Sequence, residues 1–175
     1  MLNKQKDWDG LISALKQSTK VLKDKEKIYF YLADVYYDKK HDKQKAIHYL
    51  DEALRINPND PEVLNYLGYL YIDENIDVKA GIEMVQKALR IQPNNPYYLD
   101  SLGWGYYKEK RFKLALYYLE KANRLLKKPE STIALHLAKV YDALGYKTKA
   151  KKVALKVLKN DPQNKEARLL IERIK

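Results

Sequence analysis

The sequence contains no cysteine, only six glycines and six prolines among 175 residues, and no long run of apolar residues. Without cysteine it can form neither disulfide bonds nor thiolate metal sites. So few glycines and prolines argue against a β-sandwich and against a low-complexity chain. No stretch approaches the roughly 20 apolar residues of a transmembrane helix. The start, MLNKQKDWDG, lacks the apolar segment of a secretory signal, so we expect a soluble, cytoplasmic chain as the sequence is written.

Residues suited to catalysis or to metal binding are present, but they form no recognisable site. His41, His48 and His136 are scattered, without the spacing of metal ligands. No nucleotide-binding loop, dinucleotide fingerprint or nucleophile elbow occurs. The acidic residues are spread along the chain, whereas paired-carboxylate chemistry needs two that converge in a dry pocket. The sequence therefore predicts a protein that is not an enzyme and holds no metal or cofactor.

The chain does contain a repeat of 35 residues, marked by Tyr36, Tyr71, Tyr106 and Tyr141. Three residues before each of these tyrosines stands Ala or Gly, and four residues before each stands Leu. Seven residues before them stand Tyr29, Leu64, Leu99 and Ala134. A fixed period of about 20 to 50 residues is typical of stacked structural units. Such arrays present a long binding surface rather than a central pocket.

Each repeat has the apolar pattern of two helices. Leu64, Leu67 and Tyr71 fall on one face of a first amphipathic helix. After a polar turn, Gly81 and Ala88 mark the stripe of a second helix. Small residues in these stripes allow two helices to approach closely. A proline ends each unit, because it lacks an amide donor and disfavours helix in the residue before it.

The pattern Leu-Gly-x-x-Tyr, then Ala-x-x-x-Leu-x-x-Ala, then Pro resembles the tetratricopeptide repeat. This resemblance implies an all-α fold, an α-solenoid of stacked antiparallel helix pairs. The tract LGYLYIDENIDVKAGIEMVQKALRIQPNNPYYLDSLGWGYYKEKRFKLALYYLEKA is similar to repeat pairs of bacterial multi-repeat proteins of this family, and the similarity covers about residues 61–160. Some such relatives are envelope lipoproteins and others are cytoplasmic, so the resemblance indicates a class and an origin but no partner.

We expect an N-terminal half repeat at 7–25, four full repeats and a capping helix at 165–175. The full repeats are placed at 26–60, 61–95, 96–130 and 131–164. The half repeat corresponds to a second helix without its first, which would leave apolar surface uncovered. Three interpretations fit this half repeat: a natural cap, an edge used for self-association, or truncation of a longer array. We favour truncation. A fragment of an exported protein would place the chain in the envelope.

The binding groove of such a stack is lined by the first helix of each repeat. At about 100° per residue, Trp104 lies about 160° from Tyr106, away from the core stripe. We therefore expect Trp104 to be open to the groove and its removal to cost little stability. Neighbouring Gly105 either clears a notch for a ligand or admits the adjoining helix. The predicted groove residues are Tyr31, Asp34, Tyr66, Tyr69, Asp73, Tyr97, Ser101, Trp104, Lys108, His136 and Lys139.

The aromatic groove favours a protein-interaction scaffold that binds a peptide or a partner helix, because large rigid aromatic side chains dominate binding hot spots. The groove positions that correspond to the chaperone-tail carboxylate clamp of this family do not supply its cations, so that chemistry is not expected. A second hypothesis is self-assembly through the N-terminal edge.

The net charge is +11, and residues 131–175 carry eleven basic and four acidic side chains. A third hypothesis is therefore nucleic-acid or other polyanion binding by the basic last repeat.

Overall fold

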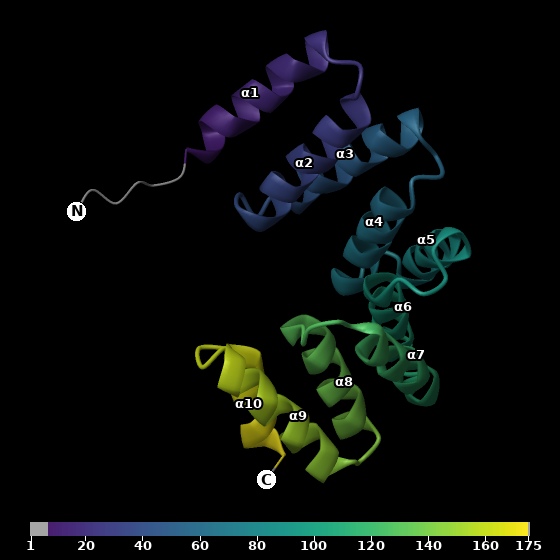
Figure 1. Cartoon of the computed structure of the whole chain (residues 1–175), viewed down its shortest axis with the longest axis vertical. Coiled ribbons are helices and arrows are strands. Elements are labelled where there is room, and N and C mark those ends of the chain that lie inside the picture. Colours follow the sequence, from purple (N-terminus) through teal and green to yellow (C-terminus); the bar gives the residue numbers. More distant parts are fainter. Residues whose placement is uncertain (1–6, 175) are drawn as a thin grey trace, which may run out of the picture. The chain divides into compact units, whose positions relative to one another are not determined.

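The computed structural model describes residues 7–174, which form ten α-helices and no strand (Figure 1). The helices are α1 (Trp8–Val21), α2 (Lys25–Asp38), α3 (Lys43–Ile56), α4 (Pro61–Asp73), α5 (Val78–Ile91), α6 (Pro96–Lys108), α7 (Phe112–Leu125), α8 (Ser131–Ala143), α9 (Lys147–Asn160) and α10 (Lys165–Arg173). The predicted all-α fold of paired helices is confirmed. The chain start and the last residue of the predicted capping segment, 1–6 and 175, lie outside the described residues.

The chain divides into two compact units, residues 1–67 and 68–175, with the boundary inside α4. In unit 1, α2 packs against α3, and α1 packs against α2. Leu32 and Leu50 have no exposed surface, and the rings of Tyr36 and Tyr49 stack with centroids 5.5 Å apart. These contacts follow the predicted apolar stripes of the first repeat.

Unit 2 repeats this packing along the chain, with α6 against α7 and α8 against α9. Each pair also contacts the next, because α7 packs on α8 and α10 packs on α9. Gly68 of α4 faces Gly81 of α5 so closely that a Cβ atom on Gly68 would lie 2.7 Å from the Gly81 carbonyl oxygen. Gly68 and Gly81 therefore mark a point where two helix backbones meet.

Gly105 serves helix packing rather than a ligand. A Cβ atom at this position would lie 2.6 Å from Cγ1 of Ile82, a residue of α5. The glycine therefore admits the adjoining helix, the second of the two interpretations given above.

The repeated tyrosines belong to the core of their units. Tyr36, Tyr106 and Tyr141 are at most 9 % exposed, and Tyr71 is half-buried. The Tyr141 hydroxyl donates a hydrogen bond of 2.8 Å to Oε1 of Glu120. Burial, and then this hydrogen bond, raises the pKa of Tyr141 to about 12.

The last helix, α10, is tied to α8 near both of its ends. Near its start, Glu166 accepts a hydrogen bond of 2.8 Å from Lys139. At its end, Arg173 donates to Asp142 at 2.6 Å, and Lys147 of α9 donates to the same carboxylate at 2.7 Å. Burial opposes the charge of Asp142, but these two cations hold its pKa below the usual value.

Candidate functional site

The groove hollow, as we call it, is a depression of about 480 Å³ in unit 2. Side chains of α4, α6, α8 and the start of α10 surround it. Its lining consists of Tyr69, Asp73, Trp104, Thr132, Leu135, His136, Lys139, Gln163, Asn164, Lys165 and Glu166. The volume lies within the usual range for small-molecule and side-chain pockets.

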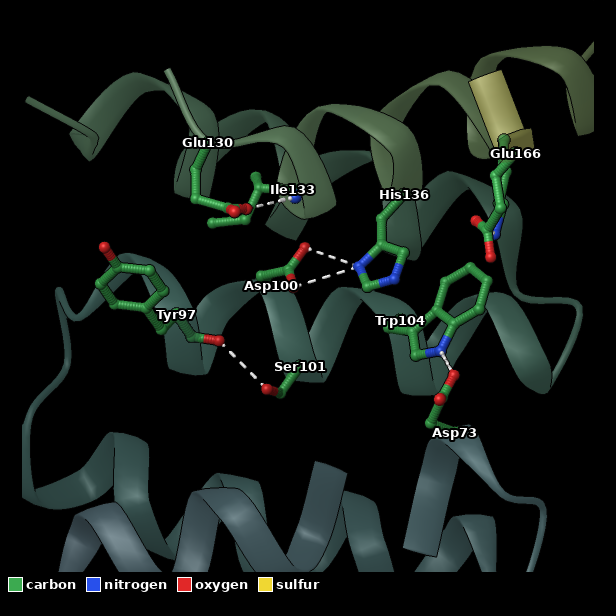
Figure 2. Close-up of polar contacts among 10 residues, drawn as sticks. Asp73, Tyr97, Asp100, Ser101, Trp104, Glu130, Ile133, His136 and Glu166 are labelled. Atoms are coloured by element: carbon green, nitrogen blue, oxygen red, sulfur yellow. Dashed lines mark hydrogen bonds and ion pairs between the residues drawn. The ribbon is translucent and has the colours of Figure 1, made fainter. Parts of the chain in front are cut away.

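Trp104 lies in a column of three parallel rings, two of which, Trp104 and His136, belong to the floor of the groove hollow. Its indole stacks on Tyr107 at a centroid distance of 4.7 Å and on His136 at 4.1 Å. The indole Nε1 donates a hydrogen bond of 2.9 Å to Oδ1 of Asp73, as Figure 2 shows. Trp104 is only 5 % exposed, so the expectation that it stands open in the groove is wrong. The reason is that His136, from the following first helix, covers one face of the indole.

A buried acid–base pair fixes this histidine. Nδ1 of His136 lies 3.0 and 3.1 Å from the two carboxylate oxygens of Asp100, which points toward it from α6 (Figure 2). Both side chains are buried, at 5 % and 6 % exposure. A buried carboxylate is costly unless it is hydrogen-bonded, so the imidazole satisfies Asp100 while Asp100 sets the plane of the ring. The pair thus holds the ring that covers Trp104.

Two lysines flank the indole, and one of them contacts a carboxylate while the other contacts a backbone carbonyl. Lys139 Nζ lies 5.0 Å from the Trp104 ring centroid, and its hydrogen bond to Glu166 holds the pKa of that carboxyl below its usual value. Lys108 Nζ lies 5.2 Å from the same ring and donates to the carbonyl oxygen of Asp73 at 2.8 Å. The side of the groove hollow therefore carries fixed charges of both signs around an aromatic floor.

Of the predicted groove residues, five line this hollow: Tyr69, Asp73, Trp104, His136 and Lys139. Ser101 is buried instead, and its hydroxyl donates to the carbonyl oxygen of Tyr97 at 3.1 Å. The Tyr97 side chain is 56 % exposed and lies outside the lining, as Lys108 does.

The remaining three predicted groove residues belong to unit 1. Tyr31 is 58 % exposed and Asp34 is exposed. Tyr66 is half-buried, and its ring lies 5.6 Å from that of Phe30. Burial first, and then the charges of Asp34 and Asp38, raises the pKa of the Tyr66 hydroxyl. These residues form a separate aromatic and acidic surface within unit 1.

Several lining residues were missed by sequence reasoning. Thr132 follows Tyr97 by one period of 35 residues, so the repeat itself could have identified it. The stretch 163–166 comprises the end of the connection to α10 and the first two residues of that helix, which was expected only to cap the array, and so it received no place in the predicted groove. The last helix therefore supplies a wall of the hollow as well as a cover for the core.

The surfaces behind the two alternative hypotheses are exposed. Leu11 of α1 is 41 % exposed, and Leu22, just after this helix, is 52 % exposed. Six exposed lysines lie on α9, namely Lys147, Lys149, Lys151, Lys152, Lys156 and Lys159.

Among residues 7–174, no group of three or more acidic or histidine side chains could hold a metal ion. Within the same range, no helix is long and apolar enough to cross a membrane.

Comparisons with known proteins agree with this architecture. A family model described as tetratricopeptide repeat matches residues 1–161, whereas no curated protein sequence matches the chain. A chain of the APC/C hetero-tetramer Cut9-Hcn1 aligns with a TM-score of 0.81 and 21 % identity over 95 % of this chain, which spans 32 % of that chain. TTC0263, a thermophilic TPR protein of Thermus thermophilus, aligns with a TM-score of 0.76 and 16 % identity over 95 % of this chain and 90 % of its own.

A third similar solved structure contains a bound peptide. The first TPR of Spaghetti (RPAP3) bound to the HSP90 peptide SRMEEVD aligns with a TM-score of 0.59 and 24 % identity. The alignment covers 65 % of this chain and 89 % of that one. At these identities the three likenesses show a shared fold.

Proposed function

We propose, because the chain belongs to the tetratricopeptide repeat family, that its groove hollow binds an extended segment of a partner protein. Folds of this family generally serve as protein-interaction scaffolds, and one structural neighbour is bound to a peptide. The observation that carries the proposal is the pair of stacked rings, Trp104 and His136, that lines the groove hollow and is backed by the ring of Tyr107.

The column supports peptide binding because it is rigid before any ligand arrives. Asp73 fixes the indole and Asp100 fixes the imidazole, so neither ring has to lose rotational freedom on binding. Preorganised surfaces of this kind gain affinity by reducing the entropic cost of association. A peptide side chain with an apolar body would rest on this floor beside Leu135.

The charges at the edge favour a peptide over a uniformly apolar ligand. Lys139 is half-buried, and Glu166 is exposed. Both can form additional hydrogen bonds with a backbone amide or with a polar side chain. Because the two residues have opposite signs, they would select a direction of the peptide rather than a net charge. The expected partner is therefore a polar segment with one apolar anchor residue.

The test uses two matched variants, Thr132→Arg and Thr148→Arg. Both threonines are exposed and both are the second residue of their helices, α8 and α9, but only Thr132 lines the groove hollow. A random peptide library displayed on phage is panned against the wild-type protein, and enriched peptides are then titrated against all three proteins. We expect Thr132→Arg to weaken binding at least about tenfold, because a long cation fills the hollow, and Thr148→Arg to have no effect.

A second readout locates the binding event. The chain has two tryptophans, Trp8 and Trp104, so a Trp8→Phe background makes Trp104 the only indole. Enriched peptides should change its fluorescence. The proposal is overturned if the enriched peptides bind Thr132→Arg as tightly as the wild type, or if panning enriches no peptide at all.

A further inference from the structure

A second depression, which we call the lysine-rimmed hollow, lies on another face of α8. It has a volume of about 300 Å³ and is bounded by α7, the connection 126–130, α8 and α9. Its lining consists of Asn123, Leu126, Lys127, Lys128, Pro129, Glu130, Ser131, Ala134, Leu137, Val153, Lys156, Val157 and Asn160. It shares no lining residue with the groove hollow and is independent of the function proposed above.

The lysine-rimmed hollow lies at a repeat position that carries a smaller residue. Ala134 stands where Leu64 and Leu99 stand in the two preceding repeats. Those leucines are buried, at 4 % and 2 % exposure, and Leu99 packs with Ala122 of its own repeat and with Ile133 of the next one. Replacing leucine by alanine in a packed interface removes atoms that the neighbours do not fully replace. Val157 of α9, which stands where Ala122 stands in the preceding repeat, packs with Ala134 and takes up part of this space, and the hollow is the part that stays open.

The lining combines an apolar floor with a cationic rim. Ala134, Leu137 and Val157 belong to the floor. Three lysines, Lys127, Lys128 and Lys156, stand at the rim, and all are exposed. The one acidic residue of the lining is Glu130, whose Oε2 already accepts a hydrogen bond of 2.9 Å from the Ile133 amide.

This combination points to one class of ligand. An apolar ligand without charge would leave the lysine rim unused, and a polar anion would gain nothing from the floor. A molecule with an apolar chain and an anionic end satisfies both parts, because burial of the chain and attraction of the head act together. Lysine ammonium groups can bind such a head group because each is a compact charge on a flexible side chain.

We propose that the lysine-rimmed hollow binds a short-chain to medium-chain fatty-acid anion, with its chain on Ala134 and its carboxylate among Lys127, Lys128 and Lys156. At about 30 Å³ for each water-sized atom, 300 Å³ has room for at least about ten non-hydrogen atoms. Octanoate has that size. Its affinity is expected in about the millimolar range or tighter, as for a ligand of so few atoms.

The experiment titrates octanoate, below its micelle concentration, into full-length protein labelled with ¹³C in the methyl groups of alanine, leucine and valine. We expect the methyl signals of Ala134, Val153 and Val157 to shift in a saturable manner. Octanol tests the role of the head group and should bind about tenfold more weakly, because it cannot form charge-assisted hydrogen bonds. Octylammonium, with the opposite charge, should not bind.

Variants separate the two parts of the site. Ala134→Leu restores the residue of the preceding repeats, so it should fold and should reduce octanoate binding at least about tenfold. Ala143→Leu, at an exposed position near the end of the same helix, is the matched control and should bind as the wild type does. The double variant Lys127→Glu with Lys128→Glu keeps the floor and should also lose binding. Equal binding of octanoate and octanol, or undiminished binding by Ala134→Leu, would overturn the proposal.

Discussion

Replacing Trp104 tests the view that this residue is a structural floor rather than a free binding side chain. The substitutions are Trp104→Ala and Trp104→Phe. Truncation of a buried tryptophan to alanine costs about 3 to 5 kcal/mol of unfolding free energy. Trp104 belongs in this range because it is 5 % exposed and stacked between two rings. Phenylalanine keeps an aromatic ring and loses the hydrogen bond to Asp73, so we expect a loss of about 1 to 2 kcal/mol.

The assay is urea denaturation followed by circular dichroism in the far ultraviolet. Tyr97→Ala is the matched control, since Tyr97 lies on the same helix and is 56 % exposed. It should change the unfolding free energy by no more than about 0.5 kcal/mol. The expected order of stability is wild type and Tyr97→Ala, then Trp104→Phe, then Trp104→Ala. A loss of less than about 1 kcal/mol in Trp104→Ala would refute the reasoning, and would return this residue to the exposed role expected from the sequence.

Two further predictions concern the packing of helices and the response to alkaline pH. Gly68→Ala should cost about 1 to 3 kcal/mol in the same assay, because its Cβ would meet the Gly81 backbone. Gly105→Ala should cost less, since its Cβ would meet only side-chain atoms of Ile82 and Ile72, and an equal loss in both variants would contradict this ranking. Because the pKa of Tyr141 is raised to about 12 from about 10 in an unfolded chain, its stabilising effect is complete below about pH 10 and is lost as the pH rises through 12. Urea midpoints between about pH 8 and 11.5 should therefore fall less steeply in Tyr141→Phe than in the wild type, and parallel curves would exclude this role of Tyr141.

The repeat in the sequence was sufficient to predict the helical architecture. The spacing of Leu64, Leu67 and Tyr71 predicted a helix, and these residues lie in α4. The stripe around Tyr106 predicted the core face of α6, and Leu99, Leu102 and Tyr106 are buried there. Such success is expected because helical periodicity is a local property of the chain.

The burial of Trp104 could not be predicted in the same way. A helical wheel gives the direction of a side chain relative to its own helix, but not what covers that direction. Here the cover is His136 of α8, whose ring orientation depends on Asp100 of α6. The positions 35 residues before and after Asp100 hold Asn65 and Leu135, so the acid–base pair does not follow the repeat. An interaction that is used once leaves no periodic signal.

The attachment of α10 to α8 couples the local unfolding of α10 to the binding of a segment in the groove hollow. A helix of nine residues is marginal on its own, so α10 depends on its contacts with α8 and α9. This helix cannot open without breaking the contacts of Glu166 with Lys139 and of Arg173 with Asp142. Because the stretch 163–166 is also a wall of the groove hollow, loss of the first turn of α10 would open that wall. A segment bound to that wall would therefore make the loss of the first turn of α10 less favourable.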